Sequence, residues 1–323
     1  MDMTSAPAIE AIGLTRAFGD NLAVKGIDLA VGRSEIYGFL GPNGAGKTTT
    51  VRMLATLMRP TAGTARVAGV DVVADPASVR LRIGVALQEA SLDDQQSGRE
   101  LLELQARLFA LPRAAARKRI AELIELVDLG DAIDRRVGTY SGGMRRRLDL
   151  ALALVHQPEV LFLDEPTTGL DPASRRQVWR EVRRLNEEAG ITVFLTTQYL
   201  EEADELAHRV GIIADGRIVA QGSPDELKRA VGRDVVVVRV DGDADLAHAA
   251  VIGLPDVERV DIGENEVRVI VSDGPAAVPQ VAARLALVEG LSVREMTLRR
   301  PTLDDVFLEV AGREMAPMQG VTQ

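Results

Sequence analysis

The sequence predicts an α/β protein in which a phosphate-binding domain is followed by a small α+β domain. Residues 41–49 read Gly-Pro-Asn-Gly-Ala-Gly-Lys-Thr-Thr, between a strand-like segment and a helix-like segment. A second apolar segment, at 160–163, ends in the acids Asp164 and Glu165, as buried strands of ligand-binding parallel sheets often do. From Asp234 onward, Val-rich segments alternate with helical ones. We therefore expect domains at 1–231 and 232–312, followed by a tail at 313–323.

The composition is that of a soluble globular protein and argues against general binding to nucleic acid. Of the 323 residues, 46% are hydrophobic and 27% are charged. The formal net charge of −10 disfavours nucleic acid, whose phosphates attract basic surfaces. The sequence has no cysteine, which excludes disulfides and suits a reducing cytosol. We find neither a signal peptide nor an apolar run of about 18 residues, so another chain must supply any membrane part.

Residues 41–49 match the phosphate-binding pattern of Gly, four residues and Gly-Lys-Thr. Glycine at 41, 44 and 46 lets the backbone turn its N–H groups toward a polyphosphate. Lys47 is expected to bind the β- and γ-phosphates, and the Thr48 hydroxyl to bind Mg²⁺. Residues 35–40 read as the strand entering the loop and 48–58 as the helix leaving it, whose N-terminus favours anions. The candidate nucleotide-binding residues are Gly41, Pro42, Asn43, Gly44, Ala45, Gly46, Lys47, Thr48 and Thr49.

Short strands are expected on both sides of this loop. Alternating apolar and polar residues at 8–32 predict antiparallel strands that turn at 18–20. Phe18 either presents its ring to an adenine base or plugs the hairpin, and the residues alone favour neither. Residues 64–68 and 81–87 read as two further strands, the second of which ends at Gln88.

Residues from about 90 to 158 are expected to form a helical subdomain. Leucines at 101, 104, 108 and 111 recur at helical spacing. Ser141 is a good N-cap for a helix that runs toward residue 156, and Gly142 and Gly143 leave the first N–H groups uncovered. With Met144, this segment is a second candidate anion site, although Ser-Gly-Gly also begins ordinary helices. The run 145–147, Arg-Arg-Arg, is expected to be a solvated helix face.

The acids that follow the strand at 160–163 are the candidate catalytic groups. Asp164 is placed to hold magnesium, and Glu165 to take a proton from an attacking water. Two solvated acids at a strand end are the plainer alternative. Asp171 lies in a turn before Pro172, which begins the next helix. A buried strand at 191–196 then leads to Gln198.

The remaining elements are predicted from turn motifs and from residue composition. Asp215-Gly216 predicts a hairpin between strands 209–213 and 217–220, and a helix at 224–230 closes the first domain. The second domain is expected to contain strands 234–241, 257–262, 266–272 and 291–298 and helices 243–252, 276–288 and 302–311. This order predicts a ferredoxin-like fold. We expect regulation or dimerisation rather than catalysis there, and a disordered tail after Gly312.

The order of these motifs over residues 8 to about 230 resembles the ATP-binding cassettes of ABC transporters. The motifs that carry the resemblance are the glycine loop, Gln88, Ser141-Gly142-Gly143, Asp164-Glu165 and Asp171. Three stretches resemble, more closely, the ATP-binding subunits of daunorubicin-resistance exporters. They are Tyr-Ser-Gly-Gly-Met-Arg-Arg-Arg at 140–147, Leu-Thr-Thr-Gln-Tyr-Leu-Glu-Glu-Ala-Asp at 195–204 and Arg-Pro-Thr-Leu-Asp-Asp-Val-Phe-Leu at 300–308.

The resemblance implies a P-loop NTPase fold with an antiparallel β subdomain and a helical subdomain, and hydrolysis of ATP with Mg²⁺. It implies a dimer in which the phosphate loop of one copy and the Ser141 helix of the other sandwich each ATP. It also implies that Gln88 senses magnesium and contacts a permease, that Phe18 stacks on adenine and that Asp171 bridges the two sites. The expected metal-site residues are Thr48, Gln88 and Asp164, and the expected catalytic residues are Lys47, Gln88, Glu165 and Gln198.

Two positions depart from the general cassette pattern. Met144 stands where glutamine is common, which matters little if backbone N–H groups bind the phosphate. Gln198 stands where most cassettes carry a histidine, and none of the three histidines can replace it in sequence. Glutamine can donate a hydrogen bond but cannot titrate near neutrality. Because the drug-resistance family also has glutamine here, we interpret Gln198 as a working substitute.

We therefore expect the energising subunit of an exporter of hydrophobic compounds, such as an antibiotic or a lipid-like molecule. The resemblance places it at the cytoplasmic side of the membrane, peripherally, beneath two copies of an integral membrane ABC-2-type permease. The alternative is a cassette ATPase that acts on nucleic acid or ribosomes, which the acidic charge and the single cassette disfavour. A P-loop kinase or GTPase would not explain Ser141-Gly142-Gly143.

Overall fold

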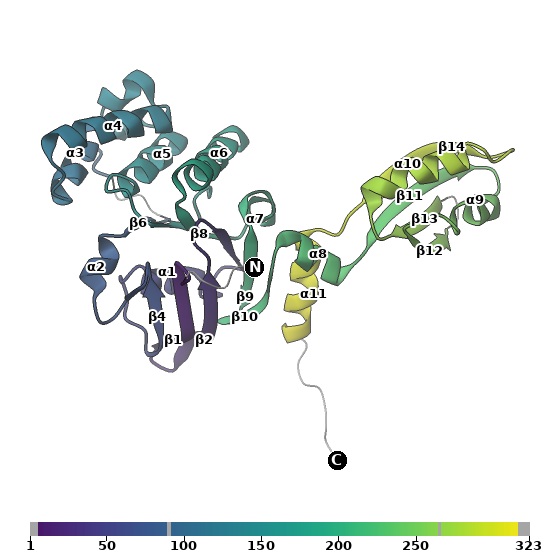
Figure 1. Ribbon diagram of the computed structural model, residues 1–323, viewed down its shortest axis with the longest axis horizontal. Coiled ribbons are helices and arrows are strands. Elements are labelled where there is room, and N and C mark those ends of the chain that lie inside the picture. Colours follow the sequence, from purple (N-terminus) through teal and green to yellow (C-terminus); the bar gives the residue numbers. More distant parts are fainter. Residues whose placement is uncertain (1–5, 89–91, 264–265, 316–323) are drawn as a thin grey trace, which may run out of the picture. The chain divides into compact units, whose positions relative to one another are not determined.

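The computed structural model describes residues 6–88, 92–263 and 266–315. The chain divides into two compact units, residues 1–224 and 225–323. The helices and strands are labelled in Figure 1.

The first unit is built on a six-stranded sheet with the order β10-β9-β3-β8-β7-β6. All neighbouring pairs are parallel except β9 and β10, which form the antiparallel hairpin predicted from Asp215-Gly216. The strands are β3 (Ile36–Leu40), β6 (Ile83–Ala86), β7 (Val160–Asp164), β8 (Thr192–Thr197), β9 (Arg209–Ala214) and β10 (Arg217–Gly222). The residues of β3, β7 and β8 are all buried, which explains their nearly continuous apolar sequences.

A second, antiparallel sheet packs over one face of the central sheet. Its order is β2-β1-β4-β5. The strands are β1 (Ile9–Phe18), β2 (Asn21–Val31), β4 (Ala62–Val67) and β5 (Val70–Asp71). One core joins this sheet to helix α1 (Lys47–Leu54) and to Tyr37, Phe39, Phe162 and Phe194 of the central sheet. The antiparallel strands predicted at 8–32 are thus confirmed.

Helices cover the other face of the central sheet. A second core unites them with β7 and β8. These helices are α3 (Gly98–Leu108), α4 (Arg113–Val127), the short 3₁₀ turns η1 (Gly130–Asp134) and η2 (Val137–Thr139), α5 (Gly142–Ala153) and α6 (Pro172–Ala189). The predicted helical region between β6 and β7 is therefore present. Two short helices, α2 (Pro76–Arg80) and α7 (Leu200–Leu206), complete the unit, and neither is among the predicted elements.

The second unit has the predicted ferredoxin-like topology. Its antiparallel sheet has the order β12-β13-β11-β14. The elements are β11 (Asp234–Asp241), α9 (Ala244–Val251), β12 (Val257–Ile262), β13 (Glu266–Val271), α10 (Gly274–Leu285) and β14 (Ser292–Arg299). Valines at alternate positions of β11, Val236, Val238 and Val240, pack with α9 and α10 in a separate core. The fold class is confirmed for both parts of the chain.

Two expectations about the ends of this unit need correction. The sequence predicts helix α8 (Pro224–Val231) as the end of the first domain, but the chain divides after Pro224, so nearly all of α8 belongs to the second unit. The last helix, α11 (Leu303–Met315), continues past the predicted tail start at 313, and residues 316–323 lie outside the described residues. None of the helices in the described part of the chain is long and apolar enough to cross a membrane.

Candidate nucleotide-hydrolysing site

Three neighbouring parallel strands deliver the candidate site residues to one edge of the central sheet. The phosphate loop follows β3, the acids end β7 and Gln198 follows β8. The strand register places Leu40 beside Thr197 and Asp164 beside Thr196. Because the carboxyl ends of parallel strands form a common edge, the topology brings together residues that are far apart in sequence.

The phosphate loop is held tightly against the strands around it, and two of its glycines have no room for a side chain. A Cβ on Gly41 would lie 2.3 Å from the carbonyl oxygen of Ile213 on β9. Gly46 has a φ of +108°, and a Cβ there would lie 2.6 Å from the carbonyl oxygen of Ala23 on β2. Glycine is therefore required at both positions by close approach, and at Gly46 by backbone conformation as well.

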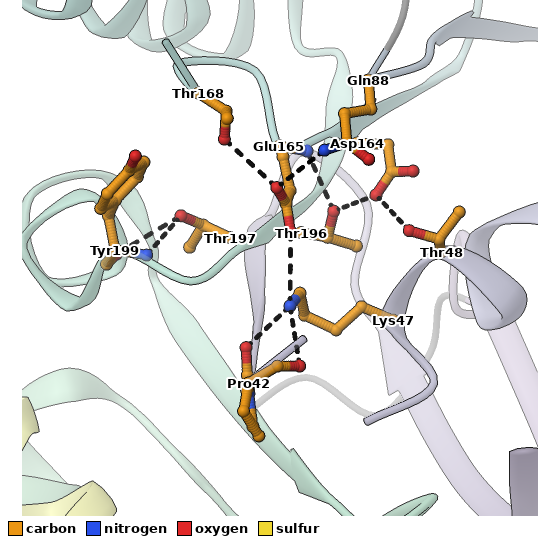
Figure 2. Close-up of polar contacts among 11 residues, drawn as sticks. Pro42, Lys47, Thr48, Gln88, Asp164, Glu165, Thr168, Thr196, Thr197 and Tyr199 are labelled. Carbon is orange, nitrogen blue, oxygen red and sulfur yellow. Dashed lines mark hydrogen bonds and ion pairs between the residues drawn. The ribbon is translucent and has the colours of Figure 1, made fainter. Parts of the chain in front are cut away.

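Lys47 points into the site and is only 4% exposed. Its ammonium group donates hydrogen bonds to the carbonyl oxygens of Gly41 (2.7 Å) and Pro42 (3.1 Å). It also lies 3.4 Å from Oε1 of Glu165 (Figure 2). A buried ammonium ion needs acceptors, and these are the groups that a bound phosphate could replace.

Asp164 is fixed by hydroxyl groups on one of its carboxylate oxygens only. Oδ1 accepts hydrogen bonds from Thr196 (2.5 Å) and Thr48 (3.2 Å), as Figure 2 shows. Oδ2 is buried and has no hydrogen-bond partner among the described residues. A buried carboxylate oxygen without a hydrogen-bond partner is costly, so Oδ2 is suited to bind a cation. The Thr48 hydroxyl, the other expected metal ligand, hydrogen-bonds to the same carboxylate.

The donor set fits Mg²⁺ bound with its substrate better than a metal held by protein alone. In the part of the chain that the structure describes, no group of three or more His, Asp or Glu side chains could hold a metal ion. Mg²⁺ usually keeps several waters and binds one or two carboxylates together with substrate phosphates. Thr48 and Asp164 could supply two of its oxygen ligands.

Glu165 is buried beside the loop and is held from three sides. Its Oε2 accepts hydrogen bonds from Thr168 (3.2 Å) and from the amide group of Gln88 (3.4 Å), while Oε1 faces Lys47 (Figure 2). Its backbone has a φ of +48°, and its N–H donates to the Thr196 hydroxyl (3.1 Å). Such strain in a non-glycine residue is typical of functional positions. The plainer alternative of two solvated acids is wrong, because Asp164 and Glu165 are 1% and 7% exposed.

The second candidate anion site lies apart from the loop. Ser141 caps α5 and accepts a hydrogen bond from the Met144 N–H (3.3 Å), as predicted. Gly143 packs closely on α6, since a Cβ there would lie 2.8 Å from the Ser174 hydroxyl. Asp171 caps α6 through the N–H groups of residues 173 and 174. In Figure 1, α5 lies with α3 and α4, well away from α1. Among the described residues, none of 141–144 hydrogen-bonds to the phosphate loop, so one chain does not unite the two anion sites.

Gln198 and Phe18 are more exposed than the groups around Lys47. Gln198 directly follows β8 at the common strand edge, and its half-buried side chain makes no hydrogen bond to the described residues. Phe18 is 44% exposed, which does not suit a hydrophobic plug. The guanidinium carbon of Arg16 lies 4.7 Å from the centre of the Phe18 ring.

The prediction of a solvated arginine face on α5 is wrong. Arg146 is 8% exposed and donates hydrogen bonds to backbone carbonyls beside both acids. Arg147 donates to the carbonyl oxygens of Val127 and Asp128, and Arg145 pairs with Asp94. The buried residues of α5 include 143, 146, 150 and 153. Their helical spacing can be read from the sequence, and it could have indicated that Arg146 lies on the buried face of the helix.

Comparison with known proteins agrees with this geometry. A model of the ABC transporter family matches residues 24–168, and a model of the C-terminal domain of DrrA1-3-like ATP-binding proteins matches residues 222–311. The chain is 50% identical over 311 residues to the daunorubicin resistance ATP-binding protein DrrA2 of Streptomyces coeruleorubidus, covering 94% of this chain and 95% of the relative. It is 40% identical over 314 residues to the Nod factor export ATP-binding protein I of Ralstonia nicotianae, covering 96% of each.

A solved structure shows the same fold. The dimeric structure of a bacterial ABC transporter cassette matches 67% of this chain and 98% of its own length, with a TM-score of 0.61 and 25% identity. The chain therefore belongs to the ABC transporter family as an ATP-hydrolysing subunit, and within that family to the daunorubicin-resistance type of ATP-binding protein.

Proposed function

We propose that this ATPase drives the export of a hydrophobic compound, of the daunorubicin and doxorubicin class, through a separate ABC-2-type membrane permease. The observation that carries the catalytic part is the convergence of Lys47, Asp164 and Glu165 on one strand edge. The transport part rests on the relatives, which are named for daunorubicin resistance and for Nod factor export. The comparisons give no support to the alternative of an ATPase acting on nucleic acid or ribosomes.

We propose the following roles at the phosphates. Residues 41–49 cradle the β- and γ-phosphates of ATP, and Lys47 exchanges its loop carbonyl partners for phosphate oxygens. Thr48 and Asp164 would hold Mg²⁺, which would neutralise phosphate charge, and Gln88 would sense the bound ion. Glu165 accepts the proton of the attacking water, and Gln198 donates a hydrogen bond to the γ-phosphate. Phe18 stacks on the adenine ring.

The proposed active form is a head-to-tail dimer. Ser141, Gly142, Gly143 and Met144 of one copy would complete the phosphate site of the other, and Asp171 would bridge the two sites. This proposal is supported by the exposure of Ser141 and Gly142 at the start of α5, where helix N–H groups favour anions. It is supported as well by the separation of these residues from the loop of their own chain, which leaves part of the γ-phosphate charge unmatched.

We propose that the permease docks beside the Gln88 segment, which keeps the ATPase peripheral at the cytoplasmic side of the membrane. A cavity of about 410 Å³ adjoins this segment. Its walls include the apolar residues Leu57, Leu87, Leu92, Phe109 and Leu152. An intracellular segment of the permease with an apolar face would fit it, and the path to Glu165 would run through Gln88.

An efflux assay tests this function. The chain and a candidate permease are expressed together in a drug-sensitive bacterium, and cellular doxorubicin fluorescence is followed. Lower drug accumulation is expected with both proteins, and not with the permease plus a Lys47→Ala variant. Unchanged accumulation, together with ATPase activity stimulated by DNA or ribosomes, would overturn the transport proposal.

A further inference from the structure

Arg146 is a buried arginine on α5 that uses its full hydrogen-bonding capacity. A guanidinium group has five N–H donors and no acceptor. All five donors have acceptors here, from three segments of the chain. Nε donates to the carbonyl of Pro166 (3.0 Å), Nη1 to the carbonyl of Leu87 (2.6 Å) and the carboxylate of Asp149 (3.0 Å), and Nη2 to the carbonyls of Asp164 (3.2 Å) and Ala86 (3.4 Å).

The backbone acceptors of Arg146 flank the proposed catalytic residues. The carbonyls of residues 164 and 166 lie on either side of Glu165. The carbonyls of residues 86 and 87 come immediately before Gln88. One planar group therefore fixes the main chain around the acid and the start of the segment that carries the glutamine amide. Lysine could not do this, because it has three donors on a single atom.

The helix that carries Arg146 begins at the proposed dimer contact. Arg146 lies five residues beyond the cap Ser141, a distance of about 7.5 Å along a helix at 1.5 Å per residue. Asp149, one turn further on, pairs with the guanidinium and lines the cavity next to Gln88. A short rigid segment thus connects the α5 N-terminus, the cavity wall and the backbone of Glu165.

We infer that Arg146 is a positioning residue for ATP hydrolysis. It holds the backbone on either side of Glu165, and the backbone that leads into Gln88, at a fixed position relative to α5, and it does not touch the nucleotide. The inference rests on the proposed role of Glu165. Proton transfer requires the base to lie within hydrogen-bond reach of the attacking water. A displacement of about 1 Å by a remote mutation can lower the rate by about 10²-fold. The loss is expected in kcat, since none of the hydrogen bonds of Arg146 to the described residues reaches the phosphate loop.

The first test compares Arg146→Lys with Arg145→Gln in the full chain. Arg145 is the matched control, because it lies on the same helix but makes a single ion pair with Asp94. We expect Arg146→Lys to lower kcat by about 10²-fold and to leave the affinity for a fluorescent ATP analogue within about twofold. Arg145→Gln should leave both within about twofold. A normal kcat in Arg146→Lys, or an equal loss of kcat and nucleotide affinity, would overturn the inference.

A second variant separates positioning from stability. Arg146→Gln alone would leave the buried Asp149 carboxylate without its cation, so the double variant Arg146→Gln/Asp149→Asn removes both charges. We expect the double variant to have a higher thermal midpoint than Arg146→Gln alone, because no unpaired buried charge is left, while kcat remains low. Wild-type kcat in the double variant would show that Arg146 only balances Asp149. If Glu165→Gln is inactive while both Arg146 variants are fully active, this inference fails alone. If Glu165→Gln is active, the proposed catalytic role of Glu165 fails instead.

Discussion

The substitution Glu165→Gln tests the proposed general base with little change in shape. The contacts of Glu165 indicate how a glutamine would fit. Its amide oxygen can face the Lys47 ammonium, where Oε1 now lies at 3.4 Å. Its amide nitrogen can donate to the Thr168 hydroxyl, which is able to accept, and the Gln88 amide can turn its oxygen toward it. The variant should therefore fold and bind ATP.

Turnover in Glu165→Gln should fall because an amide cannot take a proton from water. General-base catalysis contributes about 10²–10⁴-fold, which corresponds to about 3–5 kcal/mol of activation free energy. The assay is phosphate release at saturating ATP and Mg²⁺, with analogue binding measured on the same preparation. Turnover within about threefold of the wild type would refute the role of Glu165, since no base would then have been lost.

Three further predictions follow from other residues of the site. Gln198→Ala should lower turnover while Gln198→His keeps it, measured as phosphate release; equal activity of all three proteins would exclude a role for this side chain. Gly41→Ala places a Cβ 2.3 Å from the Ile213 carbonyl oxygen, so the loop must move, and calorimetry should show ATP binding weakened by about tenfold or more; unchanged affinity would contradict it. Burial raises the pKa of Asp149 from its usual 3.8 to about 6, so the folded state binds this proton more tightly than the unfolded chain does. As the pH rises from about 4 to 6 this proton is released, and its contribution to stability is lost. Over this range the free energy of unfolding of the wild type, measured by urea denaturation, should therefore fall relative to that of Asp149→Asn, and parallel pH profiles would contradict this.

Patterns that are local in sequence predicted most of the fold. The phosphate loop and the strand that ends in Asp164 combine an apolar run with a specific ending, so both could be located without knowing what surrounds them. The strands of the second unit were placed closely as well, because β11 is rich in valine and β13 alternates buried residues with more exposed ones. The topology then followed from the order of the elements.

Contacts between distant segments were not predictable in this way. Arg146 stands in a run of three arginines, which is typical of an exposed helix face, yet its acceptors come from residues 60 positions before it and 20 after it. The hydroxyl of Thr196 contacts Asp164 only because β7 and β8 are neighbours in the sheet. Thr168 was missed since nothing in the sequence indicates that the chain after Glu165 turns back onto its carboxylate. The assignment of α8 likewise depends on packing partners later in the chain.

The central claim is that two copies of this chain share each ATP between the phosphate loop of one and the Ser141 helix of the other. The most direct test is the molar mass of Glu165→Gln by light scattering after gel filtration, with and without ATP and Mg²⁺. We expect one chain, 34.7 kDa, without nucleotide and twice that mass with it. Adding Ser141→Arg to this variant should leave ATP binding intact and abolish the dimer. A protein that binds ATP and remains at the mass of one chain would contradict the account.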